Sequence, residues 1–429
     1  MRILHVSTRL ILGGSQENTV LSCEGQARLG HDVHLAFGPI YGPEGSLLER
    51  VQGFRTPGGR GITTHVVPDL IRAIHPFRDW RARAQLRALI ARLKPDIVHT
   101  HSSKAGIIGR IAAWRAQGVS RPGIIHTIHG PPFMPVEGSA LSRARTRAVN
   151  KLYEIAERVA ARRCHAIVSV CDEMTRQFLA RGIGTPDRYV TVYSGMESER
   201  FLAPDPGESR DEVRARLALA PGRFVIGTVA RLAQHKGHDD LLDALGRDLA
   251  KQPEWALLWV GDGWWRERLV ARARELGLRV HELDRPRASS PDSPAAGQRL
   301  PQVYLTGLVP PERVPGLIRA MDVLAHPSLR EGLPRTVPQA LLCGVCPVAY
   351  DVDGTREACI EGQTGRLVPA GDLPGLREAV VGLWREPSER DRLARRGREL
   401  CRERFSAETM VRGLEAVYAH ALARAREPG

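Results

Sequence analysis

Two successive series of short apolar segments, separated by amphipathic segments, constrain the fold of this chain more than any other feature. The first series comprises Ile3–Val6, Val33–Phe37, His65–Val67, Asp96–Thr100, Ile124–Ile128, Ala166–Val170 and Tyr189–Tyr193. Helix-period segments lie between them, such as Ser15–Leu29, Trp80–Leu93 and Ala140–Arg163. The second series comprises Phe224–Val229, Ala256–Val260, Val303–Thr306, Val323–Ala325 and Cys346–Ala349. Strands that alternate with helices predict parallel sheets in doubly wound α/β domains.

The break between the two series is rich in proline and glycine. A length of 429 residues suits two domains. We therefore expect an N-terminal domain at 1–200, a linker at 201–222 around a short charged helix, and a C-terminal domain at 223–405. The end of the chain, 406–429, is expected to form an amphipathic helix. Asp284–Pro301 has no periodicity and is expected to be a surface loop.

Composition narrows the class of protein but does not fix it. The net charge of +14 comes mostly from arginine and suits nucleic acid, anionic lipid or phosphorylated ligands, although solvated arginines on helices explain it equally well. No run approaches the roughly 18 apolar residues of a membrane span, and Met1–Leu10 lacks the features of a signal peptide, so we expect a cytoplasmic protein. Cys343 and Cys346 have no second pair nearby and are expected to be buried apolar residues.

Two segments of the first half follow strands and carry candidate binding groups. Gly13 and Gly14 precede a helix, where a backbone without side chains lets an anion approach the helix N-terminus. An ordinary strand-to-helix turn is the alternative, and the segment lacks the G-x-G-x-x-G fingerprint of dinucleotide binding. His129 lies at the carboxyl end of a strand, where α/β folds bind ligands, whereas His126 lies within the strand and is expected to be structural.

The second half places two cations on one short loop. Arg231 leaves the strand and Lys236 is expected to open the next helix. Two such cations favour an anion between them, and a diphosphate suits a guanidinium fork and an ammonium point charge. Solvated surface cations are the alternative. Gly261 lies in a tight Gly-Asp-Gly turn that either ends a strand or shapes the floor of a nucleotide pocket.

The most informative segment is Met321–Asp372. Glu331 follows a strand and a loop, and its carboxylate can accept hydrogen bonds from sugar hydroxyls. Thr336 is a plausible N-cap, which places Pro338 and Gln339 in the first helical turn. The helix N-terminus would then point its N–H groups toward the same region as Arg231 and Lys236. Gln339 also fits a capping box with Thr336, in which case it only caps its own helix.

These motifs resemble those of the family 4 retaining glycosyltransferases. HPSLREGLP, CGVCPVAYDVDGTREAC and EGQTGRLVPAGD follow the family's order and spacing, and TVARLAQHKG, WVGDGWWRERL, VYLTGLVP and VYSGMESERF add to the match. ILGGSQENTV and TIHG match the N-terminal domain's loops. The resemblance implies the GT-B fold, with two Rossmann-like domains facing a central cleft and the helix at 406–429 crossing back onto the first domain.

The resemblance also implies roles for particular residues. Arg231 and Lys236 would hold the diphosphate, and Glu331 would contact the sugar. The remaining expected contacts are Gly13 and Gly14 near the phosphates, Gly261 and Val309 near the base, Gly332, Leu333 and Pro334 beside the sugar, and His129 at the reaction centre. Gln339 stands where the family usually has a second glutamate that contacts the ribose, and its amide accepts a hydrogen bond without charge assistance.

We therefore expect transfer of a hexose-type sugar from a nucleoside diphosphate, with UDP favoured, to a hydroxyl of a glycan or a lipid-linked acceptor, with retention. No metal or other cofactor is expected, and nucleic acid is not an expected partner. A nucleotide-sugar epimerase or phosphorylase on the same fold is one alternative. Another is a basic membrane-surface protein, because Arg72–Arg92 carries many arginines together with Phe77 and Trp80. A lipid-linked acceptor would reconcile the glycosyltransferase with the membrane-surface protein. The enzyme would then lie peripherally at the inner face of a membrane.

Overall fold

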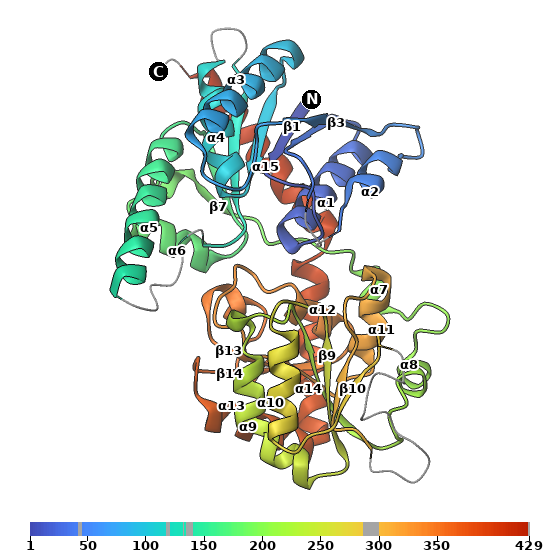
Figure 1. The fold of residues 1–429 in the computed structure, drawn as a ribbon. Coiled ribbons are helices and arrows are strands. Elements are labelled where there is room, and N and C mark those ends of the chain that lie inside the picture. The colour runs from blue at the N-terminus through green and yellow to red at the C-terminus, as the bar shows by residue number, and fades with distance from the viewer. Residues whose placement is uncertain (42–44, 117–120, 132, 134–139, 286–299, 428–429) are drawn as a thin grey trace. The chain divides into compact units, whose positions relative to one another are not determined.

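A computed structural model of the chain describes all residues except 42–44, 117–120, 132, 134–139, 286–299 and 428–429. The described chain divides into two compact units (Figure 1). Unit 1 comprises Met1–Met196 together with Phe405–Gly429, and unit 2 comprises Glu197–Arg404. Most of the loop expected at Asp284–Pro301 lies outside the described residues.

Unit 1 is built on a sheet of seven parallel strands in the order β3-β2-β1-β4-β5-β6-β7. The strands are β1 (Arg2–Ser7), β2 (Asp32–Phe37), β3 (Ile62–Val66), β4 (Ile97–His101), β5 (Gly123–Ile128), β6 (Ala166–Ser169) and β7 (Tyr189–Thr191). All seven segments expected in this half form strands. The direction in which successive strands are added reverses between β1 and β4, and open α/β sheets bind ligands at such a switch point.

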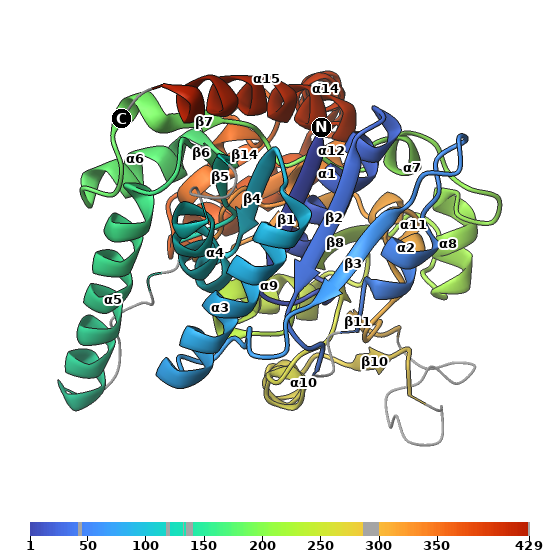
Figure 2. The ribbon, with the colours of Figure 1, turned by 90° about the horizontal axis from the view of Figure 1, so that it is seen from above.

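Helices cover both faces of the unit 1 sheet. They are α1 (Gly14–Arg28), α2 (Leu48–Gly53), α3 (Pro76–Leu93), α4 (Ser103–Arg115), α5 (Ala140–Ala161), α6 (Asp172–Ala180) and α15 (Ala407–Arg426). Figure 2 shows α15 along one face, with α3 and α4 on the other. Because side chains alternate along a strand, Ile3, Ile97 and Ile125 share the face that packs against Leu414 and Tyr418 of α15. The last helix therefore completes the core of unit 1.

Unit 2 repeats this architecture with a second parallel sheet, in the order β10-β11-β9-β8-β12-β13-β14. Its strands are β8 (Phe224–Val229), β9 (Trp255–Val260), β10 (Val280–Glu282), β11 (Val303–Leu305), β12 (Val323–His326), β13 (Cys346–Tyr350) and β14 (Arg366–Val368). The edge strand β14 was not expected from the sequence. The switch point lies between β8 and β12.

The helices of unit 2 are α7 (Glu199–Leu202), α8 (Arg210–Arg216), α9 (His238–Lys251), α10 (Arg266–Glu275), α11 (Val314–Arg319), α12 (Thr336–Leu342), α13 (Leu373–Arg385) and α14 (Pro387–Arg404). The interpretation of 201–222 as a linker is corrected here, because this segment folds as part of unit 2. Arg214 in α8 forms an ion pair with Asp322 at 2.6 Å, and Asp322 also accepts the amide N–H of Val225 at 2.7 Å. The charged face of α8 is thus tied to the central strand β8.

None of the described helices combines the length and the apolar character needed to cross a membrane.

Candidate nucleotide-sugar site

An ion pair lies at the switch point of unit 2. Lys236 follows β8 and Glu331 follows β12, so the two side chains extend from the neighbouring strands between which the strand order reverses. The Lys236 ammonium donates to Glu331 Oε1 at 2.6 Å, and both side chains are largely buried. Lys236 was expected to be the first residue of the next helix, but it is not. It lies in a 3-10 helix, Gln234–Lys236, and Gly237 separates it from α9.

The carboxylate of Glu331 has a second partner beneath it. His326 Nε2 lies 3.0 Å from Glu331 Oε1, and Thr336 Oγ1 lies 3.2 Å from His326 Nδ1. Burial alone would raise the pKa of Glu331, but the charge of Lys236 and the contact with His326 outweigh it and hold the pKa well below its usual range. The carboxylate is therefore ionised and fixed in orientation.

The loops that carry these residues are held against one another by their backbones. Leu329 N–H donates to the carbonyl of His235 at 2.8 Å, and Ser328 Oγ donates to the same oxygen at 3.1 Å. Gly237 has a φ of 68°, and a Cβ at this position would lie 1.9 Å from the carbonyl oxygen of Pro327. Only glycine satisfies both the backbone conformation and the close approach. The Lys236–Glu331 pair is thus set by backbone contacts on both sides.

Two backbone amides beside Glu331 have no acceptor among the described residues. They are the N–H groups of Gly332 and Leu333. The amide of Glu331 itself donates to Asp353 Oδ2 at 2.7 Å, and the carbonyl of Gly332 accepts from Gly354 at 3.0 Å. Of the three residues expected beside the sugar, Pro334 has no N–H to donate. Two donors remain next to an ionised carboxylate.

Arg231 differs from Lys236 in having no carboxylate within ion-pair distance among the described residues. It is exposed, and its guanidinium lies 5.6 Å from the centre of the Trp264 ring. Gly261 brings this loop close to the end of β9, because its φ is 136° and a Cβ would lie 2.3 Å from the carbonyl of Ala230. Gly261 also pairs with Gly307, two residues before Val309. The two residues expected near the base therefore lie on adjacent loops.

The capping box expected at α12 does not form. The N-cap is Arg335 rather than Thr336, and no side chain caps the helix. Thr336 Oγ1 is held instead by His326, which the sequence pattern did not reveal. Gln339 lies half-buried in the first turns of α12, where its backbone N–H donates to Arg335 and its carbonyl accepts from Cys343, and its side chain has no hydrogen-bond partner among the residues that the structure describes. The interpretation of Gln339 as a capping residue is thus wrong, which leaves its side chain available for a ligand.

In unit 1 the expected residues lie around the ends of β1 and β5. Gly13 precedes α1 with extended backbone, and Gly14 is the first residue of that helix. His129 follows β5, and its Nε2 lies 3.1 Å from Nδ1 of His101 at the end of β4. His126 is buried on the opposite face of the sheet and donates to the Thr100 carbonyl, as expected for a structural residue.

Sequence reasoning missed three groups that shape these sites: His326, Asp353 and His101. His326 and His101 are the last residues of buried strands, so their position carried the same signal that identified His129. Asp353 has a φ of 44°, an unfavourable conformation for a residue with a side chain. Its carboxylate holds the amide of Glu331, a contact that no spacing in the sequence reveals.

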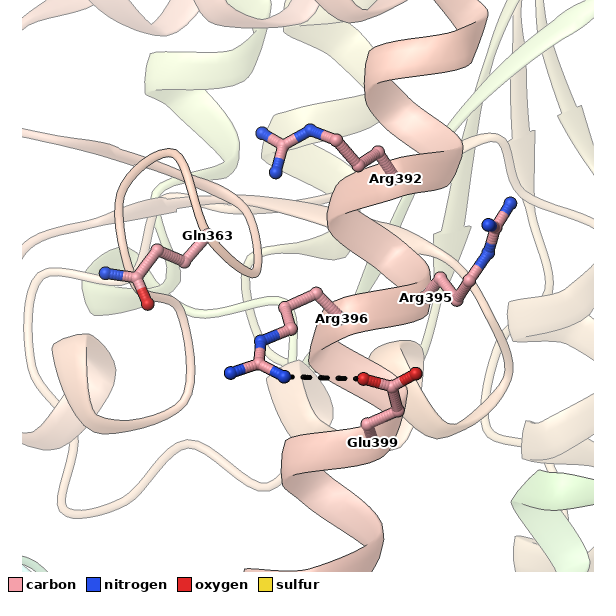
Figure 3. A pocket seen from close by; sticks show the side chains of 5 residues that line it. All are labelled: Gln363, Arg392, Arg395, Arg396 and Glu399. Atoms are coloured by element: carbon pink, nitrogen blue, oxygen red, sulfur yellow. Dashed lines mark hydrogen bonds and ion pairs between the residues drawn. The ribbon is translucent and has the colours of Figure 1, made fainter.

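Two other features of unit 2 lie apart from this constellation. Cys343 and Cys346 are free thiols, and burial raises the pKa of each to about 12, which fits the expected apolar role. A surface pocket is lined by Gln363 and by four charged residues of α14 (Figure 3): Arg392, Arg395, Arg396 and Glu399. None of the expected site residues lines this pocket.

Comparison with known proteins identifies the class to which this fold and constellation belong. Residues 12–200 match the model of "Glycosyltransferase Family 4", and residues 223–386 match that of "Glycosyl transferases group 1". Together the two models span well over half of the chain. The chain belongs to the family 4 glycosyltransferases, and its two Rossmann-like sheets form the GT-B fold.

Individual relatives are enzymes of the same class. The chain is 25% identical over 385 residues to a UDP-Gal:alpha-D-GlcNAc-diphosphoundecaprenol alpha-1,3-galactosyltransferase of Escherichia coli, covering 89% of this chain and 87% of that protein. It is 29% identical over 331 residues to a D-inositol 3-phosphate glycosyltransferase of Acidothermus cellulolyticus, covering 77% and 68%. The structure of Anabaena HepE with UDP and glucose superposes with a TM-score of 0.74 at 19% identity, covering 98% and 99%.

Proposed function

We propose that this glycosyltransferase moves a hexose from a nucleoside diphosphate, with UDP favoured, to a hydroxyl of a glycan or a lipid-linked acceptor. The observation that carries the proposal is the arrangement at the switch point of unit 2: the Lys236–Glu331 pair, together with the Arg231 guanidinium and two backbone amides that have no carboxylate or acceptor partner within the part of the chain that the structure describes. The Escherichia coli relative is named for a UDP-galactose donor and a diphosphoundecaprenol-linked acceptor, which supports the two substrate classes.

In this proposal the cations bind the diphosphate and the carboxylate binds the sugar. Arg231 offers a fork of N–H donors to phosphate oxygens, and Lys236 offers a point charge that stabilises the departing diphosphate. Glu331 accepts hydrogen bonds from sugar hydroxyls, with Gly332 and Leu333 as donors beside it. Because protein cations neutralise the leaving group, we propose that no metal is needed, and transfer should be unchanged by EDTA.

We further propose that the anomeric configuration is retained through a same-face route. Retention by double displacement needs a carboxylate nucleophile at the anomeric carbon. The carboxylate of Glu331 is a poor nucleophile, because Lys236 and His326 both bind it and its pKa is well below the usual range. A route in which the leaving phosphate takes up the acceptor proton needs no such nucleophile. The configuration of the product at the anomeric carbon, read by NMR, tests this assignment.

The donor site is tested by hydrolysis and binding, because neither requires the acceptor to be known. A panel of UDP-, GDP- and ADP-hexoses is incubated with the enzyme, and melting temperature is recorded with each nucleoside diphosphate. We expect release of UDP and a rise in melting temperature with UDP, and both should disappear in Arg231→Ala and in Lys236→Ala. Arg247→Ala and Lys251→Ala, at exposed positions of α9, are the matched controls. Full activity in either site variant would refute the diphosphate assignment.

The same incubation separates the rival enzyme classes. An epimerase would convert the donor sugar without an acceptor and leave it attached to the nucleotide. A phosphorylase would require inorganic phosphate and yield a sugar phosphate. We expect only slow hydrolysis with water as the acceptor.

A second proposal, association with an anionic membrane surface, rests on the start of α3. Phe77 and Trp80 are 61% and 57% exposed and their rings stack at 6.3 Å, while Ile74 beside them is 50% exposed. Exposed arginines, including Arg87 and Arg92, continue along the same helix. Apolar side chains beside cations suit the headgroup region of anionic lipid.

Sedimentation with phosphatidylglycerol vesicles tests this second proposal. We expect binding at low salt that weakens at high salt and is lost in a Phe77→Ser, Trp80→Ser variant. Trp114→Ser, which removes another partly exposed tryptophan of unit 1, is the control. Equal binding by the variant and the control would overturn the proposal.

A further inference from the structure

Buried histidines occupy one face of the central strands of unit 1. His5 of β1, His99 and His101 of β4 and Thr127 of β5 point to the same face as Ile3, Ile97 and Ile125, because side chains alternate along each strand. All three histidines are at most 1% exposed. Burying a polar ring in such a core is costly unless its nitrogens are hydrogen-bonded. Each ring nitrogen is therefore expected to have a hydrogen-bond partner.

The rings form one continuous hydrogen-bonded chain that reaches His129. His129 Nε2 lies 3.1 Å from His101 Nδ1, and His101 Nε2 lies 2.9 Å from His5 Nδ1. His5 Nε2 then lies 2.7 Å from Oε1 of Gln26 in α1. From Gln26 the chain continues through Tyr418 of α15 and His99 to Thr127, with separations of 2.7, 2.7 and 2.6 Å.

The amide of Gln26 gives this chain a direction. An amide oxygen only accepts, so His5 Nε2 must carry a proton and donate it. Burial lowers the pKa of His5 to about 4 and holds that of His101 well below its usual range, so both rings are neutral at pH 7. A neutral imidazole carries one proton. His5 Nδ1 therefore accepts from His101 Nε2, and His101 Nδ1 accepts from His129 Nε2.

We propose that Gln26, acting through His5 and His101, fixes the proton of His129 on Nε2. Nδ1 is then the ring nitrogen with which His129 accepts a hydrogen bond or a proton. Gln26, His5 and His101 are positioning residues. The role of His129 in transfer rests on the proposed function, whereas the position of its proton does not.

The reverse direction of the chain shows why Gln26 is the controlling element. If the amide were rotated by half a turn, its N–H would face His5 and every ring proton would move to the other nitrogen, so that His129 would carry its proton on Nδ1. Both directions satisfy each of the six bonds traced above, and among the groups that make these bonds the amide of Gln26 distinguishes the two directions. In the structure the amide oxygen faces His5 and the amide nitrogen faces the Tyr418 hydroxyl, which in turn donates to His99.

The same three rings would also suit a metal ion, since ligand nitrogens of His5, His99 and His101 lie within 4.8 Å of one another. A metal would replace the proton between His5 and His101 by a coordinate bond at each nitrogen. The present partners leave none of these nitrogens unbonded. The proton chain and the metal therefore exclude each other, and metal content becomes part of the test.

The test is the tautomer of His129 in the full-length protein, read from imidazole ¹⁵N shifts of histidine-labelled enzyme at pH 7.5. A His129→Gln variant assigns the signals. We expect the wild type to show Nε2 protonated and Nδ1 unprotonated. A protonated Nδ1 with an unprotonated Nε2 would overturn the proposal, and so would stoichiometric zinc in the purified protein.

Gln26→Met supplies the second arm, because it removes the amide without adding charge. The His129 signals should then shift toward a mixture of tautomers, and transfer or donor hydrolysis should fall about 10-fold, since a wrong tautomer impairs a catalytic histidine even when geometry is kept. Gln85→Met is the same substitution on α3, at a residue that is not part of the hydrogen-bonded chain. It should change neither the His129 signals nor the rate of transfer or donor hydrolysis. Unshifted His129 signals in Gln26→Met would refute the proposal that Gln26 fixes the proton of His129.

The two readouts also separate this inference from the proposed function. Shifted signals with unchanged turnover would overturn the link between the tautomer and transfer, while the hydrogen-bonded chain itself would stand. The expected wild-type tautomer in a protein that hydrolyses no nucleotide sugar would refute the proposed function alone.

Discussion

Each unit is built on a parallel seven-stranded sheet with a switch point beside its first strand, but the two switch points differ in their electrostatics. In unit 2 the segments that follow β8 and β12 carry a charged pair, Lys236 and Glu331. In unit 1 the equivalent strands, β1 and β4, carry His5 and His101, which burial keeps neutral. A charged pair suits a phosphate-bearing ligand, whereas a neutral chain can orient a proton without attracting ions. Similar parallel sheets thus support two kinds of chemistry, set by the residues that the strands and loops place at the switch point.

The largest difference between the two units is expected in how much stability each loses in mild acid. The pKa of His5 is lowered to about 4, so below about pH 6.5 the unfolded chain takes up a proton that the folded unit does not, and stability falls as pH drops toward 4. From pH 7 to 5 this costs unit 1 about 2 kcal/mol for His5 alone. Burial shifts the pKa values of His99, His101 and His126 in the same direction.

Unit 2 has fewer histidines whose pKa is lowered by burial. Burial lowers the pKa of His238 to about 3, which costs this unit a similar amount over the same range. Glu331 adds no loss there, because a depressed carboxyl pKa removes stability only as pH falls below about 4.5. Hydrogen exchange of peptides from each unit at pH 7 and 5 measures the difference. Equal loss of protection in both units would contradict it.

Neutralising the charged pair should affect turnover more than folding. In Glu331→Gln the amide oxygen still accepts from Lys236, but the charge that orients the ammonium and binds the sugar is lost. We expect donor hydrolysis or transfer to fall about 10²- to 10³-fold, the size of effect seen when one preorganised electrostatic contact is removed. Glu275→Gln at the exposed end of α10 is the control. Equal kcat/KM in the two variants would show that Glu331 has no role in the reaction.

The close approach of backbones at Gly237 should tolerate no side chain. Gly237→Ala adds a Cβ 1.9 Å from the Pro327 carbonyl in a left-handed conformation, so the loops carrying Lys236 and Glu331 must separate. Gly277→Ala has a similar φ of 76° and nothing within 4 Å, and therefore reports the conformational cost alone. We expect Gly277→Ala to lose about 1 kcal/mol and Gly237→Ala roughly 2 kcal/mol more, by urea denaturation. Equal losses would mean that the loops move freely.

The smallest effect is expected on donor affinity, through the contact with the nucleotide ribose. Gln339→Glu should strengthen a hydrogen bond to the ribose by adding charge, and should lower the KM for the donor about 3- to 10-fold. The gain should vanish with a donor that lacks the ribose 2′- and 3′-hydroxyls. An equal gain with that donor would place Gln339 away from the ribose.

The sequence predicted the strands of both sheets well, because buried parallel strands are continuous apolar runs. It missed β14, which has three residues and lies at a sheet edge, where neighbours on one side only leave a weaker pattern. It also read 201–222 as a linker, since its Pro and Gly content resembles one. The ion pair of Arg214 with Asp322 joins residues more than a hundred positions apart, which no local pattern reveals.

For the candidate site, the sequence singled out residues but did not reveal the contacts between them. Lys236 and Glu331 were singled out separately, one for the diphosphate and one for the sugar, and their direct bond was not foreseen. Thr336 was read as a cap from its spacing to Gln339, but a buried histidine ten residues earlier binds its hydroxyl. Both cases depend on long-range geometry at the switch point, where loops from separate strands meet.

The contribution of α15 to the core of unit 1 has a consequence for synthesis on the ribosome. Unit 1 is discontinuous, since Leu414, Tyr418 and Ala421 of α15 close a core that begins at Ile3. Unit 2 is continuous. At roughly 5–20 residues per second, the first unit waits roughly 10–40 s for its last helix while the second is made. The unit that emerges second can thus finish folding first, and the exposed sheet face of the earlier unit is the part of the nascent chain most in need of a chaperone.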